Sequence, residues 1–204
     1  ELVYGPNKVC GLRSGSAAQA AKAAGAVYGG LIFEEASPRN VSRETAAEII
    51  TAEPGLDYVA VSRRTSGYGD LVQPGITAVQ VHAPYQGTLD TERELIERVR
   101  REVDVEVWRA VDMTALNDAE GVAELVDRLV LDSGAGGTGE RFDWSRILTT
   151  DALLAGGLTP GNLDEALRTG CLGLDLNSGF EDPRGHKDAA ALRRGFATIR
   201  NFHF

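Results

Sequence analysis

The chain has 204 residues, and its 21 Lys and Arg residues against 30 Asp and Glu residues give a formal net charge of −9 at pH 7. This acidic balance disfavours nucleic acid as a partner, because binding to a phosphate backbone requires a basic face. The sequence has no apolar run near the ~20 residues of a membrane span, no signal-peptide pattern and only two cysteines, so we expect a cytoplasmic protein with no membrane partner.

The first half of the chain alternates short apolar runs with helical patterns. The apolar runs predict strands over 8–11, 26–33, 57–61 and 77–82. Helices are predicted over 16–24 and 42–52. Residues 65–74 contain Gly67, Gly69 and Pro74, so we expect at most a short helix after the third strand.

The second half continues the same alternation. Strands are predicted over 105–111, 128–132, 152–155 and 172–176, and helical segments over 91–103, 122–126, 143–148, 160–168 and 187–200. The charged residues from Glu92 to Arg101 predict a solvated helix face. The glycine-rich segment 133–138 has neither the Gly-Lys-Ser/Thr of a P-loop nor the spacing of a dinucleotide-binding turn, and we interpret it as a mobile active-site loop.

Strands that alternate with helices or loops predict a parallel sheet. Eight such units in 204 residues favour a single, compact (β/α)₈ barrel domain over 1–204 with a shortened third βα unit, near the lower size limit of this fold. An open doubly wound sheet usually has fewer strands at this length. The first residue is Glu rather than Met, so we expect a piece of a longer chain or a processed chain.

Barrel enzymes place their chemistry at the carboxyl ends of the strands. The residues at or just beyond these predicted ends are Cys10, Arg39, His82, Asp132, Gly156, Gly157, Asn177, Ser178 and Gly179. Alternation along each strand turns Gln80 inward with His82, Asp175 inward with Asn177, and Lys8 inward with Cys10. A buried lysine requires a partner, and Asp175 is the predicted partner of Lys8.

Cys10 and Asp132 form the pair with the clearest chemical meaning. They stand at the mouths of the first and sixth strands, on opposite sides of the barrel, where one can act as base and the other as acid on a shared substrate. The structural alternative is a small buried apolar cysteine and a carboxylate that caps a loop. Cys171 precedes the last strand at the other end of the barrel and is expected to be structural.

Two glycine-containing turns predict a phosphate site. Gly156-Gly157 and Ser178-Gly179 follow the seventh and eighth strands, where these barrels commonly bind phosphate on backbone amides. The alternative is that these glycines serve only as tight turns. Three histidines without zinc-type spacing predict no metal, and no nucleophile elbow supports a Ser-His-Asp site.

A series of motifs runs through almost the whole chain. They are Lys8-Val9-Cys10-Gly11-Leu12, Ser37-Pro38-Arg39, Gln80-Val81-His82, Leu131-Asp132-Ser133, Gly136-Gly137-Thr138-Gly139 with Phe142-Asp143-Trp144, Leu154-Ala155-Gly156-Gly157-Leu158, and Asp175-Leu176-Asn177-Ser178-Gly179 with Lys187-Asp188. In this order they resemble the phosphoribosylanthranilate isomerase family. Residues 26–33 are most similar to the isomerase half of fused proteins that also carry indole-3-glycerol-phosphate synthase, so the resemblance implies fusion to, or association with, that enzyme.

The resemblance implies an Amadori rearrangement of the small phosphorylated aminosugar N-(5-phosphoribosyl)anthranilate, without a cofactor. By similarity, Asp132 is the general acid and Cys10 the general base, and Arg39 holds the anthranilate carboxylate. Gly156, Gly157, Ser178 and Gly179 resemble the phosphate site, while Gln80, His82 and Asp175 line the pocket. Burial is expected to raise the pKa of Asp132, and a nearby positive charge such as Arg39 to lower that of Cys10.

One segment departs from the family pattern, which usually has Gly and then an acidic residue after this histidine. Here Ala83-Pro84-Tyr85 follows His82, which puts substrate preference in question. One alternative is the analogous isomerase of histidine synthesis, or a dual-substrate form, but those barrels use Asp at the position of Cys10. Another is a non-catalytic phosphosugar-binding barrel, against which intact Cys10 and Asp132 argue.

Overall fold

The computed structural model describes residues 5–115, 119–133 and 141–202. Eight parallel strands pair in chain order, and β8 pairs with β1 to close the barrel, so the predicted fold is confirmed. The strands are β1 (Lys8–Val9), β2 (Tyr28–Ile32), β3 (Asp57–Ser62), β4 (Ile76–Val81), β5 (Glu106–Asp112), β6 (Arg128–Asp132), β7 (Ala152–Leu154) and β8 (Gly173–Leu176).

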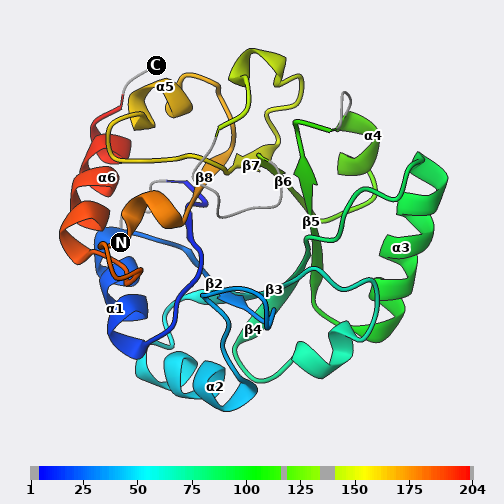
Figure 1. Cartoon of the computed structure of the whole chain (residues 1–204), viewed down its shortest axis with the longest axis horizontal. Helices are drawn as coiled ribbons and strands as arrows, with labels where there is room; N and C mark the ends of the chain where they lie inside the picture. Colours follow the sequence, from blue (N-terminus) through cyan, green and yellow to red (C-terminus); the bar gives the residue numbers. More distant parts are fainter. Residues whose placement is uncertain (1–4, 116–118, 134–140, 203–204) are drawn as a thin grey trace.

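Helices surround the strands, as Figure 1 shows along the barrel. The α-helices are α1 (Gly15–Ala24), α2 (Arg43–Ala52), α3 (Leu89–Glu102), α4 (Glu120–Ala123), α5 (Leu163–Leu167) and α6 (Ala189–Asn201). Three short 3₁₀ turns are η1 (Tyr68–Leu71), η2 (Trp144–Arg146) and η3 (Ser178–Phe180). The single turn η1 replaces a third helix, as predicted. None of the helices among the described residues is long and apolar enough to cross a membrane.

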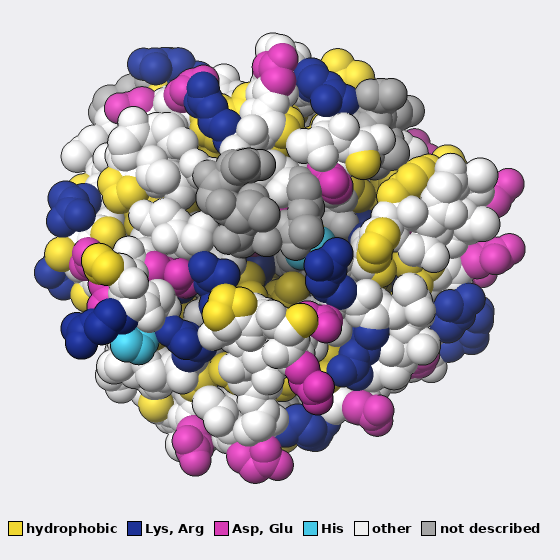
Figure 2. All heavy atoms as spheres, viewed as in Figure 1, with side chains coloured by type: hydrophobic (Ala, Val, Ile, Leu, Met, Phe, Trp, Pro, Cys, Tyr) yellow, Lys and Arg dark blue, Asp and Glu magenta, His cyan; other side chains and the backbone are white. Residues whose placement is uncertain are grey.

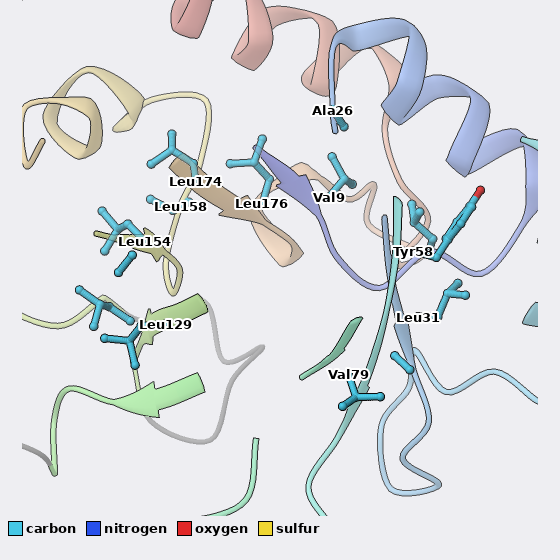
Figure 3. Packing of buried hydrophobic residues seen from close by; sticks show 14 of the residues in the cluster. Val9, Ala26, Leu31, Tyr58, Val79, Leu129, Leu154, Leu158, Leu174 and Leu176 are labelled. Carbon is cyan, nitrogen blue, oxygen red and sulfur yellow. The ribbon is translucent and has the colours of Figure 1, made fainter. Parts of the chain in front are cut away.

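Strand alternation separates the buried residues into two layers. Val9, Leu31, Leu174 and Leu176 belong to the larger cluster, between the barrel and its helices. Figure 3 shows Val9 and Leu176 on the side of their strands that faces the helices. The smaller cluster fills the barrel and consists of Cys10, Val59, Val61, Ala78, Trp108, Ala110, Val130, Leu153 and Ala155. The predicted inward position of Cys10 is therefore confirmed.

An aromatic and cationic cluster fills part of the barrel interior at the start of the strands. The rings of Tyr28 and Trp108 meet edge to face with their centroids 4.8 Å apart. The guanidinium of Arg128 lies 5.7 Å from the centroid of Tyr28 and 5.3 Å from that of Trp108. Arg128 pairs in register with Trp108 near the amino end of β6, well before Asp132. These side chains fill space below the carboxyl-terminal ends, where the predicted site lies.

The prediction for residues 92–101 is wrong at Glu92. Its carboxylate is buried and accepts hydrogen bonds of 2.8 Å from both Nε and Nη2 of Arg109 on β5. The same guanidinium donates to the carbonyls of Val81 and Ala83. The backbone N–H of Gln86 donates to Glu92 at 2.8 Å. This buried ion pair therefore anchors the segment after β4 that departs from the family pattern.

The last helix begins later than predicted. Asp188 caps α6 by accepting hydrogen bonds from the backbone N–H groups of Ala190 and Ala191, so the helix starts at Ala189. Lys187 consequently lies outside the helix, and its side chain is almost completely buried. The predicted glycine-rich loop over 133–138 lies outside the described residues except for Ser133.

Candidate active site

A cavity of about 510 Å³ opens at the carboxyl-terminal ends of the strands. Figure 2 shows Lys and Arg side chains around the centre of the corresponding face. The structure brings together nine of the ten residues to which the resemblance assigns a role, because all except Gly179 line this cavity. The nine are Cys10, Arg39, Gln80, His82, Asp132, Gly156, Gly157, Asp175 and Ser178.

Lys8 lies beneath the cavity and is completely buried. Its Nζ donates to Oδ2 of Asp175 at 2.6 Å and to Oε1 of Gln80 at 2.9 Å. The Lys8–Asp175 contact predicted from strand alternation is therefore confirmed. Oδ1 of Asp175 has no hydrogen-bond partner in the part of the chain that the structure describes, so this oxygen can accept a hydrogen bond from a ligand.

We expect the two charges of this pair to be strongly coupled in stability. The Lys8→Met variant leaves Asp175 buried without its cation, which typically costs ~3–5 kcal/mol of unfolding free energy. The Lys8→Met/Asp175→Leu double variant leaves neither charge unpaired and is expected to be more stable than Lys8→Met alone. Urea unfolding of the wild type, Lys8→Met, Asp175→Leu and the double variant measures the coupling. If the loss of unfolding free energy in the double variant equals the sum of the losses in the two single variants, the coupling is contradicted.

Cys10 follows β1. Its backbone N–H donates a hydrogen bond of 2.8 Å to the carbonyl of Leu176, which continues the pairing of β1 with β8. Burial raises the pKa of the Cys10 thiol above its ordinary value of 9.0, although the positive charges of Lys8 and Lys187 oppose this effect. The expectation of a lowered pKa is therefore wrong, because desolvation outweighs the nearby cations. The cations that act on the thiol most strongly are these two lysines rather than Arg39.

Asp132 ends β6, and β7 and β8 separate it from β1 on the ring of strands. Burial raises the pKa of Asp132 to about 7, while a hydrogen bond from the backbone N–H of Ser133 to Oδ1, 2.7 Å long, acts in the opposite direction. The direction agrees with the expectation from sequence. A carboxyl with this pKa is partly protonated at neutral pH and can donate its proton.

His82 stands beside Asp132, with 3.5 Å between Nε2 and Oδ2. Burial lowers the pKa of His82 to about 4, and the positive charges of Lys8 and Arg109 add to the effect. The imidazole is therefore neutral at pH 7. Its Nε2 has no hydrogen-bond partner among the described residues. Nε2 of His82 and Oδ1 of Asp175 are therefore two polar atoms that can form hydrogen bonds with the hydroxyl groups of a ligand in the cavity.

The two glycine-containing turns lie side by side. Gly156 and Gly157 have φ of +83° and +66°, and a Cβ at Gly156 would overlap Oγ of Ser133, so this turn requires glycine. A Cβ at Gly179 would overlap the carbonyl oxygen of Leu158, which explains why Gly179 supports the wall without lining it. Within the described part of the chain, the amides of Gly157, Ser178 and Gly179 donate no hydrogen bond, so these groups can bind an anion.

Two charged residues that the prediction missed stand beside Arg39. Glu181 accepts hydrogen bonds from Nε and Nη2 of Arg39 at 2.7 and 2.8 Å. Lys187 donates to the same carboxylate at 2.6 Å. Lys187 belongs to one of the motifs on which the resemblance rests, but nothing in the local sequence around Glu181 indicates that Arg39, 142 residues away, is its partner.

The sequence pattern of the family described as N-(5'-phosphoribosyl)anthranilate isomerase matches residues 7–197. The tryptophan biosynthesis protein TrpCF of Corynebacterium glutamicum is 59% identical over 100% of this chain and 46% of its own length. TrpCF of Salmonella typhi is 41% identical over 98% of this chain and 44% of its own length.

The chain thus spans about half the length of these curated relatives. Among solved structures, the phosphoribosyl anthranilate isomerase of Thermus thermophilus superposes with a TM-score of 0.81 and 28% identity. That match covers 97% of this chain and 99% of the other. The sequence pattern and the fold therefore agree on one family.

Proposed function

The chain belongs to the N-(5'-phosphoribosyl)anthranilate isomerase family of tryptophan biosynthesis, and on this premise we propose that it converts N-(5-phosphoribosyl)anthranilate to 1-(2-carboxyphenylamino)-1-deoxyribulose 5-phosphate. The observation that carries the proposal is that Cys10 and Asp132 line the same cavity, on strands that β7 and β8 separate. This arrangement suits a reaction that needs an acid and a base on different sides of one sugar.

The first step is ring opening with Asp132 as the general acid. Asp132 donates its proton to the ring oxygen, the bond between this oxygen and C1′ breaks, and the nitrogen lone pair forms a C1′=N bond to give a protonated Schiff base. A pKa of about 7 supports this role, because it keeps a fraction of the carboxyl protonated at neutral pH.

The second step is proton removal by Cys10. The thiolate takes the proton from C2′, the C–H electron pair forms the C1′=C2′ bond, and the electrons of the C=N bond return to nitrogen. The resulting enolamine tautomerises to the ketone when its hydroxyl loses a proton and C1′ gains one. Lys8 and Lys187 favour the thiolate in this step, since their positive charges lower the pKa that burial raises.

Substrate binding involves both ends of the cavity. We assign the anthranilate carboxylate to Arg39, because a guanidinium matches a planar carboxylate. The phosphate is assigned to the backbone of Gly156, Gly157, Ser178 and Gly179. Gln80, His82 and Asp175 then face the sugar hydroxyls between these two charged ends.

The test is an assay of the purified chain with N-(5-phosphoribosyl)anthranilate, followed by the loss of anthranilate fluorescence. We expect turnover, and we expect no activity on the aminoaldose of histidine synthesis, because Cys10 occupies the position of its aspartate base. Binding of the reduced product analogue without turnover would instead indicate the non-catalytic barrel. As a partner we propose indole-3-glycerol-phosphate synthase, fused or separate, and the approximately double length of the TrpCF relatives supports this proposal.

A further inference from the structure

Arg39, Glu181 and Lys187 form a compact charged cluster at the rim of the cavity, which we name the rim triad. The Arg39 side chain is 13% exposed, that of Glu181 7% and that of Lys187 1%. Oε1 of Glu181 contacts both Nε of Arg39 and Nζ of Lys187, at 2.7 and 2.6 Å. Lys187 also donates to Oδ1 of Asn177 at 2.9 Å. One buried carboxylate is therefore shared between two cations.

The contact with Arg39 uses only one edge of its guanidinium. Nε and Nη2 donate to Glu181, and no other hydrogen bond of Arg39's side chain occurs within the described part of the chain. A guanidinium has a second edge, formed by Nη1 and the other proton of Nη2, which can bind another carboxylate at the same time. Since Arg39 lines the cavity, this second edge is available to a ligand there.

The stem of Arg39 is also held in place. A Cβ at Gly11 would lie only 2.7 Å from Cδ of Arg39 and 2.8 Å from Oδ1 of Asn177, so the arginine stem packs directly on the glycine backbone. Arg13 donates to the carbonyl of Pro38 at 3.1 Å and to that of Gly185 at 2.6 Å, which joins the segment before Arg39 to the segment after Glu181.

We infer that Glu181, held by Lys187, is a positioning residue that fixes the Arg39 guanidinium so that its second edge receives the substrate's aromatic carboxylate. Burial acts to raise the pKa of Glu181, but hydrogen bonds from Arg39 and Lys187 outweigh it and keep the carboxylate ionised at neutral pH. Without Glu181 the arginine keeps its charge but loses its fixed direction, so binding of the carboxylate suffers more than binding of the rest of the substrate.

This inference rests on the proposed function, and its test separates the two. The variant is Glu181→Gln, which keeps the size of the side chain but removes its charge. The ligands are the reduced product analogue, which carries the carboxylate, and the same analogue with an unsubstituted phenyl ring. Glu165→Gln is the matched control, because Glu165 forms a 2.6 Å ion pair with Arg141 that is exposed to solvent.

We expect Glu181→Gln to weaken binding of the carboxylated analogue about tenfold or more and to leave the unsubstituted analogue nearly unchanged. Glu165→Gln should change neither. Equal weakening of both analogues would overturn the inference, because it would show that Glu181 only supports the cavity wall. Should Glu181→Gln fail to fold, Glu181→Asp provides the same comparison with a carboxylate too short to reach both cations.

A second measurement needs no substrate. In the ligand-free protein, hydrogen exchange of the Arg39 Nε–H followed by NMR is expected to be slow, and about tenfold faster or more in Glu181→Gln. The Arg39→Lys variant identifies the signal. An unchanged exchange rate in Glu181→Gln would overturn the inference. If the wild-type chain shows no isomerase activity, only the proposed function is contradicted.

Discussion

Replacement of Cys10 by Ser is expected to lower turnover by about 10²–10⁴-fold, the usual contribution of a general base. An alcohol releases its proton far less readily than a thiol, so the variant has almost no anionic base at neutral pH. The two side chains are nearly equal in size, and Cys10 is only 6% exposed, so the cavity should keep its shape. Binding of the reduced product analogue should therefore survive, which separates a chemical defect from a structural one.

The second free cysteine provides the matched control. Cys171 is partly exposed and precedes β8, at the opposite end of the barrel from the cavity. We expect Cys171→Ser to leave turnover unchanged in the same fluorescence assay. Full activity in Cys10→Ser would remove Cys10 from the mechanism, whereas equal losses in both variants would indicate a general effect of cysteine replacement.

Asp132→Asn is expected to cause a loss of turnover of similar size, about 10²–10⁴-fold, because an amide cannot donate the proton that opens the sugar ring. The change keeps the oxygen that accepts from the backbone N–H of Ser133, so the local turn is preserved. Asp57→Asn is the matched control, since Asp57 is exposed at the start of β3, at the opposite end of the strands from the cavity, and does not line it. Retained turnover in Asp132→Asn, with the control also active, would exclude Asp132 as the acid.

The pKa values of the two groups also predict the shape of the pH profile. The reactive form needs a thiolate at Cys10 and a protonated Asp132, yet the pKa of Cys10 lies above 9.0 and that of Asp132 at about 7. Below pH 7 the carboxyl is protonated and the thiolate falls tenfold for each pH unit. Between the two pKa values the thiolate rises as the protonated carboxyl falls, so kcat/KM is expected to be flat there.

In the wild type, the loss of the protonated Asp132 carboxyl above pH 7 offsets the gain in Cys10 thiolate, and Asp132→Asn removes this offset. Its residual kcat/KM should therefore continue to rise with pH, where that of the wild type is flat. Because both proteins are measured with the same substrate, titration of the substrate phosphate affects them equally. A flat residual profile above pH 7 in Asp132→Asn would contradict the assignment of the carboxyl to this titration.

The sequence predicted the barrel because its signals are local and repeated. Strand alternation placed Lys8 and Cys10 on one inward face, and the structure confirms both positions. The same alternation brought Asp175 to the interior, where it meets Lys8 although 167 residues separate them. Closure of the barrel fixes such pairs once the number of strands and the inward positions are known.

The predictions that failed concern charges whose partners are set by tertiary contact. The pattern of α3 indicated a solvated face, and only the position of Arg109 on β5 explains why Glu92 is buried. Glu181 meets Arg39 across 142 residues, through a loop and a 3₁₀ turn rather than through strands of fixed register. The sequence indicates cations near Cys10, but it does not indicate the extent of burial, which raises the pKa of the thiol.

The most direct measurement is a crystal structure of the chain with the reduced product, 1-(2-carboxyphenylamino)-1-deoxyribitol 5-phosphate, bound. We expect Sγ of Cys10 and the carboxyl of Asp132 to approach the sugar chain from opposite sides, with the phosphate on the amides near Gly157 and Ser178. A sugar chain that lies away from either group, or that both groups approach from the same side, would contradict acid–base catalysis by this pair.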